Sequence, residues 1–428
     1  MDIFNDATIK DLLNNQTFIL FMKVLFYTSP AWGFLLFWSV FKSVWLVYKR
    51  AQFFASQKYT LLELKLPKEI FKSPKAMEFL FNSLYQTSGE NKFKFKWKDV
   101  INDDDGKWKI DLSKIKIESE YYLKGQTRAW HSFEICSIEG KVRFFIWARS
   151  NFKNMIEAQL YSQYPGVEIF EVNDYAIPFC YNKEKESMWA TEFELTKDDP
   201  YPIKTYIDYG MDENPKEEYL IDPLTPMIEF MSSVGRDHNI WIQIIARAHI
   251  KEDTDPTTGK EIDLKWLKKA EEEIKKIQEK AKPPKDALGV QPPQRPLTKG
   301  ETNTIEALER SISKPSFDVG IRAIYFAEKE KFNKANGAGV VANFRHFNSE
   351  LNGFKGVRSP EKDKDKLEML LAYKSRQYFY NEFTQKSFVL NTEELATLFH
   401  LPGQVLTESS SIERIMSKKA DAPTNLPI

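Results

Sequence analysis

The chain has few of the residues that most often carry chemistry in a protein site. Among 428 residues it has only two cysteines and five histidines. Cys136 and Cys180 are too few for a disulfide framework, which favours a reducing compartment. No two histidines are four residues apart, and none has a cysteine or carboxylate at ligand spacing, so we expect structural or surface histidines. They are His131, His238, His249, His346 and His400.

The common phosphate-binding and nucleophile motifs are also absent. No G-x-x-x-x-G-K-[ST] loop and no G-x-S-x-G motif occurs. The nearest glycine-rich segment, Asn336–Gly339, has no Lys-Ser/Thr after it and is interpreted as a turn. Asp103–Gly106 has the start of a calcium loop but neither its ligand spacing nor its closing Glu, so we predict a solvated acidic turn. We therefore assign no catalytic, cofactor-binding or metal-ligating residue, and expect no cofactor and no enzyme activity.

The chain has no net charge, because 61 Lys and Arg residues balance 61 Asp and Glu residues. A zero total argues against bulk attraction to nucleic acid. One segment, Phe93–Lys109, mixes lysines with Phe and Trp, a combination that can stack on single-stranded nucleic acid. On a strand the same alternation simply gives an apolar face and a lysine-rich face. We favour the second interpretation and do not expect direct nucleic-acid binding.

The N-terminal region does contain a long apolar run. Residues 18–48 are rich in aromatic residues and almost uncharged. The part from about 30 to 49 is long enough for a transmembrane helix, whereas 18–27 is too short and would extend that helix or lie in the interface. A signal peptide would need a basic start and a cleavage site, and both are missing. Lys49 and Arg50 follow the run, so the positive-inside rule predicts an N-terminus outside and a cytoplasmic body.

After this predicted anchor, residues 1–56, the first half of the body covers residues 57–180. Its apolar periods change from two to about 3.6 and back in the order strand, helix, strand, strand, helix, strand. This order is typical of a ferredoxin-like, split βαβ domain. The segments are a strand near 59–69, a helix near 74–88, a hairpin of 131–138 and 141–149, a helix near 151–163 and a strand at 167–172.

The same order recurs in residues 181–403, which predicts a second ferredoxin-like domain in an α+β protein. Its segments are strands at 188–195, 239–249, 317–328 and 387–391, with helices near 222–234 and 332–347. An insertion at 251–315 separates the two middle strands. It combines a charged helix, whose thin apolar seam includes Ile274 and Ile277, with a proline-rich linker. That helix would form a coiled coil or, as we favour, lie solvated on its own domain. Residues 404–428 are expected to be a flexible tail.

Four stretches together resemble the membrane-linked N-terminal region of bacterial conjugation-type ATPases, the type IV secretion proteins of the coupling-protein and HerA/FtsK-like class. They are 61–87, 131–169, 221–244 and 388–403. In that family a tandem α+β region precedes a RecA-like motor, and the tail 411–428 resembles the segment that leads into it. No motor follows in this sequence. The resemblance therefore implies a single-pass protein of the bacterial inner membrane that works with a separate RecA-like ATPase.

The resulting hypothesis is a non-catalytic, membrane-anchored scaffold of a type IV secretion or conjugation-like transfer machine. Its partners would be the lipid bilayer, the separate ATPase and a further copy of the chain. A membrane-bound enzyme with an unrecognised site and an adaptor unrelated to secretion remain alternatives. Asn391 and Glu394 predict a capping box for a short helix. The apolar residues Leu395, Leu398 and Phe399 of this helix would either close the second domain or face the motor.

Overall fold

The computed structural model describes most of the chain. The described segments are 44–67, 73–86, 123–212, 221–249, 265–282, 295–357, 359–379 and 386–403, with short pieces at 252–254, 261–263 and 414–415 and isolated residues before 44. The chain forms two compact units: residues 1–57 with 88–127, and residues 58–87 with 128–428. The calcium-loop-like segment Asp103–Gly106 and the aromatic segment Phe93–Lys109 lie outside the described residues.

The first unit corrects the predicted fold class at the N-terminus. Its longest continuous described helix covers 44–56, which at 1.5 Å per residue is about 20 Å long, short of the roughly 30 Å of a hydrocarbon core. Across the described segments, no helix is both long enough and apolar enough to cross a bilayer. The N-terminal transmembrane helix in our predicted fold class is therefore not supported. Most of residues 30–43, where we placed its first part, lie outside the described residues.

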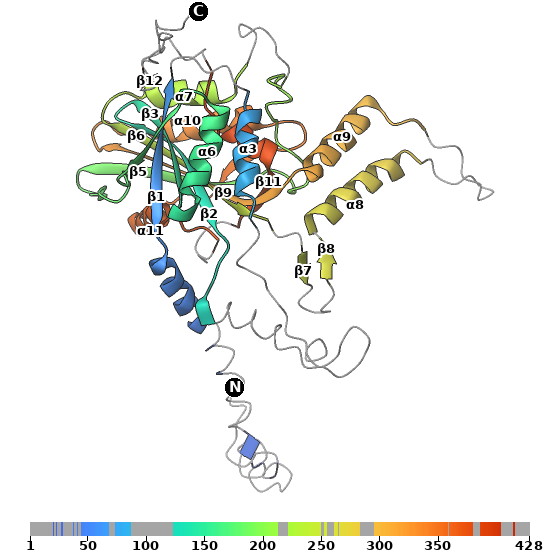
Figure 1. Cartoon of the computed structure of the whole chain (residues 1–428), viewed down its shortest axis with the longest axis horizontal. Coiled ribbons are helices and arrows are strands. Elements are labelled where there is room, and N and C mark those ends of the chain that lie inside the picture. Colours follow the sequence, from blue (N-terminus) through green and yellow to red (C-terminus); the bar gives the residue numbers. More distant parts are fainter. Residues whose placement is uncertain are drawn as a thin grey trace, which may run out of the picture. The chain divides into compact units, whose positions relative to one another are not determined.

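The second unit is an α+β structure built on a ten-stranded sheet (Figure 1). The strand order is β10-β5-β9-β6-β2-β3-β1-β12, with β4 on β1 and β11 on β9. All the pairings are antiparallel except the two-residue contact of β12 with β1. The strands are β1 (Tyr59–Pro67), β2 (Trp130–Ile138), β3 (Lys141–Arg149), β4 (Glu168–Val172), β5 (Glu186–Leu195), β6 (His238–Ala248), β9 (Ser316–Glu328), β10 (Phe354–Val357), β11 (Phe388–Asn391) and β12 (Arg414–Ile415).

The two halves of this sheet are joined edge to edge into one continuous sheet, a pairing that we did not predict. The first half has the strand order β4-β1-β3-β2 and the second has β10-β5-β9-β6. Strands β2 and β6 pair over nine positions, from Trp130 opposite Arg247 to Ile138 opposite Asn239. An unpaired edge strand exposes backbone N–H and C=O groups. The fusion satisfies both edges at once, which sequence periodicity alone does not reveal.

Local signals explain several elements. The turn between β2 and β3 places Glu139 at φ 53° and Gly140 at φ 81°, the left-handed pair that a two-residue hairpin requires. This confirms the predicted hairpin.

Helices cover one face of the sheet, because their apolar stripes and the inward strand residues form one buried cluster. These helices are α3 (Lys75–Leu84), α6 (Lys153–Gln163, after the 3-10 turn η2 at Ser150–Phe152), α7 (Leu224–Ser233), α10 (Lys334–Phe344, followed by η4 at Arg345–Phe347) and α12 (Thr392–Leu398).

The glycine-rich segment Asn336–Gly339 lies inside α10, so its interpretation as a turn was wrong. Glycine weakens a helix, but here it allows close packing. A Cβ at Gly337 would lie 2.6 Å from the ring of Trp189, and one at Gly339 would lie 2.4 Å from the ring of Phe230. The close approach of rings from β5 and α7 thus accounts for glycine at these two helical positions.

The opposite face of the sheet carries a buried polar row. Glu192, Arg322, Gln243 and Glu134 are register neighbours on β5, β9, β6 and β2. Each is at most 1 % exposed. Helix α11 (Asp363–Ser375) ends beside this row, where Gln243 Nε2 donates to Glu134 Oε1 (3.0 Å) and to the backbone carbonyl of Tyr373 (3.1 Å).

Arg376 connects the end of α11 to this polar row. It is the C-cap of α11 and has a left-handed backbone with φ 50°. Its guanidinium binds both oxygens of Glu134, at 2.8 and 3.1 Å, and both oxygens of Asp174. The hydroxyl of Tyr175 donates to Glu134 Oε2 at 2.8 Å. A bidentate Arg between two carboxylates is a strong, directional contact, so it fixes α11 and the segment around residue 174 on the sheet.

Candidate functional site

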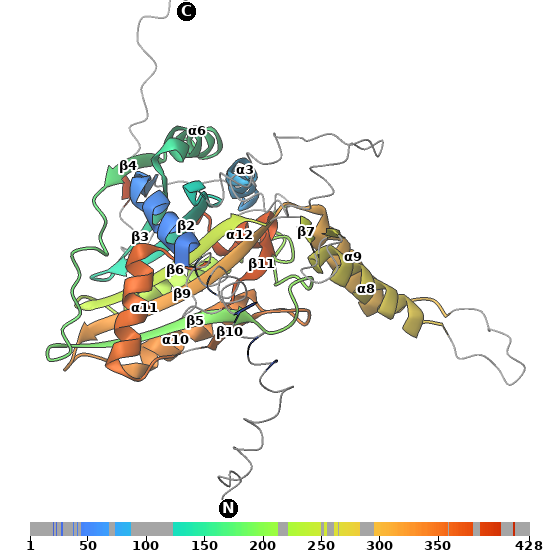
Figure 2. The same ribbon diagram turned by 90° about the horizontal axis from the view of Figure 1, so that it is seen from below.

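The most distinctive feature of the second unit is a helical hairpin, which we call the arm. It consists of α8 (Lys265–Lys280) and α9 (Lys299–Ser313), which lie side by side beyond the sheet (Figures 1 and 2). The short strands β7 (Glu252–Thr254) and β8 (Glu261–Asp263) precede it. The arm is inserted between β6 and β9, yet these strands pair over all eleven positions of β6. The pairing of β6 with β9 is therefore complete without any residue of the arm.

The first helix of the arm is tied to the loop that follows β5. The indole Nε1 of Trp266 donates to the carbonyl of Asp199 at 3.3 Å. The Tyr201 hydroxyl donates to Glu273 Oε2 at 2.7 Å, and Lys269 lies 3.6 Å from Asp198. Burial, together with the Glu273 carboxylate that accepts its hydrogen bond, raises the pKa of Tyr201 to about 12.

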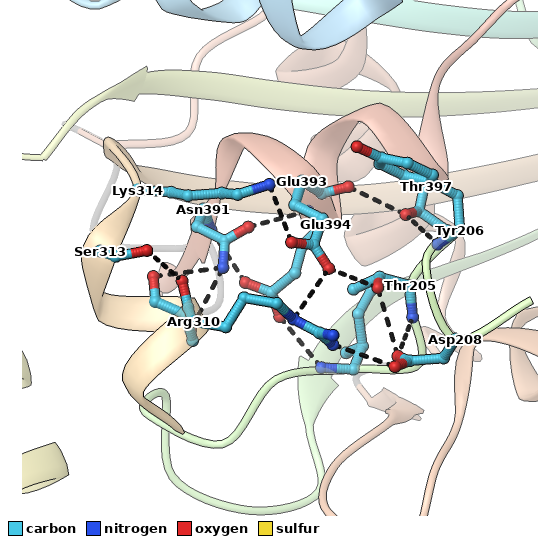
Figure 3. A network of polar contacts seen from close by, with 12 residues as sticks. Thr205, Tyr206, Asp208, Arg310, Ser313, Lys314, Asn391, Glu393, Glu394 and Thr397 are labelled. Atoms are coloured by element: carbon cyan, nitrogen blue, oxygen red, sulfur yellow. Dashed lines mark hydrogen bonds and ion pairs between the residues drawn. The ribbon is translucent and has the colours of Figure 1, made fainter. Parts of the chain in front are cut away.

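The end of α9 is tied to the core by a network of charges (Figure 3). Lys314 Nζ lies 2.9 Å from Glu393 Oε2 and 3.0 Å from Glu78 Oε1. Arg310 lies 3.0 Å from Asp208 Oδ1 and 3.5 Å from Glu393 Oε1. Arg310 on α9 and Lys314, the C-cap of α9, thus share one carboxylate of α12. Since the Glu393 side chain is only 2 % exposed, this network holds elements together and does not offer a reactive group to solvent.

Helix α12 forms the core side of the same network. Asn391 is its N-cap and accepts from the N–H of Glu394, whose side chain accepts from the N–H of Asn391, so the predicted capping box is confirmed. The Asn391 amide also donates to Ser311 Oγ of α9 at 3.2 Å. From the loop after β5, the Thr205 hydroxyl donates to Glu393 at 2.5 Å. The cap therefore joins α12, the arm and this loop.

Glu394 has an unusual environment for a carboxyl group. Burial raises its pKa to about 8, although its oxygens accept the N–H groups of Asn391 and Ile203. Those two donors favour the charged form, but loss of hydration outweighs them. At neutral pH the group therefore binds a proton more readily than an ordinary Glu does.

The apolar residues of α12 resolve an alternative that the sequence left open. Leu395, Leu398 and Phe399 are buried to 0 %, 2 % and 0 % exposure. The Phe399 ring packs on Phe133 and Phe144 from the sheet. The helix therefore closes the core of the second unit, and these side chains do not face a partner.

The histidines lie in separate environments. His131 is buried against Phe152, and burial lowers its pKa to about 3. His249 lies 2.5 Å from Asp318, and His400 lies 3.2 Å from Asp222. His238 stacks on Tyr325, and His346 is exposed. In the part of the chain that the structure describes, no group of three or more His, Cys, Asp or Glu residues is placed to hold a metal ion.

Sequence reasoning found the cap at Asn391 but not the long-range partners of the neighbouring Glu393. Arg310 and Lys314 contact Glu393, and Asp208 contacts Arg310. All three lie in segments far from α12 in the chain and carry no local signal. If the capped helix is buried, the negative charge of Glu393 needs nearby cations, and a search for such cations could have pointed to them. Both cysteines are free, as expected, with Cys136 buried and Cys180 exposed.

These features define an α+β protein with a fused antiparallel sheet and a braced helical arm. Residues 113–412, more than half of the chain, match the model of a family described as a domain of unknown function, DUF8128. The chain belongs to this family. No curated protein matches it. The family description names no activity, so the resemblance to conjugation-type ATPases stays a prediction.

Proposed function

We propose that the protein is a non-catalytic scaffold of a type IV secretion or conjugation-like transfer machine, and that it recruits and orients a separate RecA-like ATPase. The observation that carries the proposal is the arm, an addition that the sheet does not need and that is nevertheless fixed at its base through both helices. The resemblance of four stretches to the region that precedes such motors supplies the class of partner.

The surface of the arm suits a protein partner. Helix α8 contains six lysines and four glutamates among 16 residues, so most of it is hydrated. Exposed ion pairs add little to folding stability, and the charges of α8 are therefore available to select a partner and its orientation. A rigid base lowers the entropy lost on binding, because the arm is already ordered. The braced arm would hold the ATPase at a fixed angle to the sheet.

Site-specific crosslinking in the native host tests the proposal. A photoreactive amino acid replaces Lys276, which is on α8 and 61 % exposed. The matched control replaces Lys355, which is on β10 and 52 % exposed. We expect position 276 to capture a polypeptide with a RecA-like motor and a phosphate loop, and position 355 to capture none.

Three outcomes would contradict the proposal. Capture of a partner without a motor would favour an adaptor unrelated to secretion. Capture of a second copy at position 276 would make the arm a self-association surface. Equal capture of the motor at both positions would show that the arm is not the recruiting element.

A further inference from the structure

The two ends of α12 are both held by ionisable groups, and the C-terminal end depends on one histidine. His400 is 1 % exposed. Its Nδ1 lies 2.9 Å from the carbonyl oxygen of Ala396, and its Nε2 lies 3.2 Å from each carboxylate oxygen of Asp222. A carbonyl and a carboxylate can only accept hydrogen bonds. These contacts are all satisfied when both ring nitrogens donate, as they do in an imidazolium.

Asp222 connects this cation to a second helix. Its Oδ1 accepts the N–H of Leu224 at 2.8 Å, so the same carboxylate caps the first turn of α7. Asp222 and His400 are 178 residues apart in the chain. The ion pair thus joins the end of α12 to the start of α7, just before the chain continues through residues 401–403.

We propose that His400 is a proton-operated latch, whose charged ring clamps the end of α12 to α7 and whose deprotonation releases the segment 399–403. This latch is independent of the proposed recruitment of an ATPase. A neutral ring cannot donate from both nitrogens. Its second nitrogen would then present a lone pair to the carboxylate, and Asp222, with a side chain 9 % exposed, would lose its buried counter-charge.

The groups around the ring set the direction of the response. Burial lowers the pKa of His400, but the Asp222 carboxylate and the carbonyls of Ala396 and Thr397 outweigh burial and raise it overall. Asp222, on the element that precedes α7, is the charge acting on the ring; its other partners are backbone carbonyls of α12. The clamp is therefore complete below the ordinary pKa of about 6.5. It is lost as pH rises through the higher folded-state pKa.

Nitrogen NMR of the full chain with ¹⁵N-labelled histidine tests the protonation state. In a pH titration we expect the His400 ring to keep protons on both nitrogens to a higher pH than an ordinary imidazole, whose pKa is about 6.5. The His400 signal is assigned by its loss in His400→Gln. In Asp222→Asn, which keeps an oxygen for the Leu224 cap, the ring should lose its second proton at a lower pH than in the unsubstituted protein. A His400 ring that loses this proton at or below the pH of an ordinary imidazole would overturn the latch.

Hydrogen exchange at residues 399–403 tests the release. Between pH 6.5 and the folded-state pKa, the open population should rise about tenfold per pH unit, because only the clamped form holds the proton. After correction for intrinsic exchange, Asp222→Asn should show high exchange with no pH dependence. His249→Gln, which alters the other His–Asp contact, should behave like the unsubstituted protein. The same pH dependence in Asp222→Asn would show that the ion pair is structural and does not act as a latch.

Discussion

The two faces of the ten-stranded sheet are both buried, but different interactions hold their covers. On the helix-covered face, side chains such as Phe133, Ile242 and Ile321 are at most 1 % exposed and pack without directional bonds. On the opposite face, Glu134 and Arg322 are equally buried but need specific partners. Apolar packing tolerates changes of shape if volume is kept. A buried charge tolerates no loss of its partner. The polar face therefore specifies one position for α11, whereas the apolar face supplies most of the burial energy.

The largest effect is expected at Glu134. Glu134→Ala would leave the Arg376 guanidinium facing Asp174 alone and would remove the acceptor for Gln243 and Tyr175. Breaking a buried ion pair costs about 3–5 kcal/mol. Urea unfolding should show a loss of that size. The double variant Glu134→Ala/Arg376→Ala, with the single variant Arg376→Ala, measures the coupling between the two charges; Arg376→Ala also removes the partner of Asp174. A loss below about 1 kcal/mol in Glu134→Ala would mean that the polar face is hydrated.

A neighbouring position tests the apolar face. Ile242 is on β6 beside Gln243 but points into the helix-covered core, where it is 1 % exposed. Ile242→Ala should cost about 2–5 kcal/mol through lost burial and the cavity left behind. Because no charge is involved, the loss measured by urea unfolding should be the same at low and high salt. Ile242→Val is the control and should cost about 0.5–1.5 kcal/mol. A strong salt dependence would contradict the division between the two faces.

Sequence patterns foresaw one face better than the other. The period of two in the strand predicted near 59–69 puts Leu62, Leu64 and Leu66 on one face, and all three belong to the buried cluster. Nothing in such a period indicates that Glu134 and Arg322 are buried as well, because α11 and the segment near Asp174, which cover that face, are distant in the chain. Local signals such as the cap at Asn391 were readable. Contacts between distant segments determine the pairing of β2 with β6 and the partners of Glu393. The periodicity of the sequence therefore does not reveal them.

Glu394 is an exception on the apolar side, since α12 belongs to the core cluster. Its folded-state pKa of about 8 is above the value of 4.5 for an ordinary Glu. The folded protein therefore holds a proton that the unfolded chain releases, so this group lowers the stability as pH rises from 4.5 to 8. The effect is on the order of a few kcal/mol. His131, whose pKa is lowered to about 3, acts in the opposite direction up to about pH 6.5. Chemical denaturation at several pH values should show that Glu394→Gln removes the falling contribution, whereas Glu306→Gln on the exposed face of α9 leaves the pH dependence unchanged.

The pH window separates this effect from that of His400. His400 contributes no slope below pH 6.5, because its ring is charged in both the folded and the unfolded states there. Between pH 5 and 6.5, Glu394→Gln should therefore leave the rising contribution of His131 unopposed, whereas His400→Gln should leave the slope as it is in the unsubstituted protein. An unchanged slope in Glu394→Gln would show that the carboxyl is ionised in the folded protein.

The smallest effect is expected for an ion pair that is exposed to water. Lys355 and Glu194 are opposite each other on β10 and β5 and lie 2.7 Å apart, but their side chains are 52 % and 30 % exposed. An exposed pair gains little, because water screens the attraction and both side chains lose freedom. Lys355→Ala should change the free energy of unfolding by about 0–1 kcal/mol, and salt should shrink even that. A double-mutant cycle with Glu194→Ala isolates the pair energy. A coupling as large as that between Glu134 and Arg376 would mean that burial does not cause the difference between them.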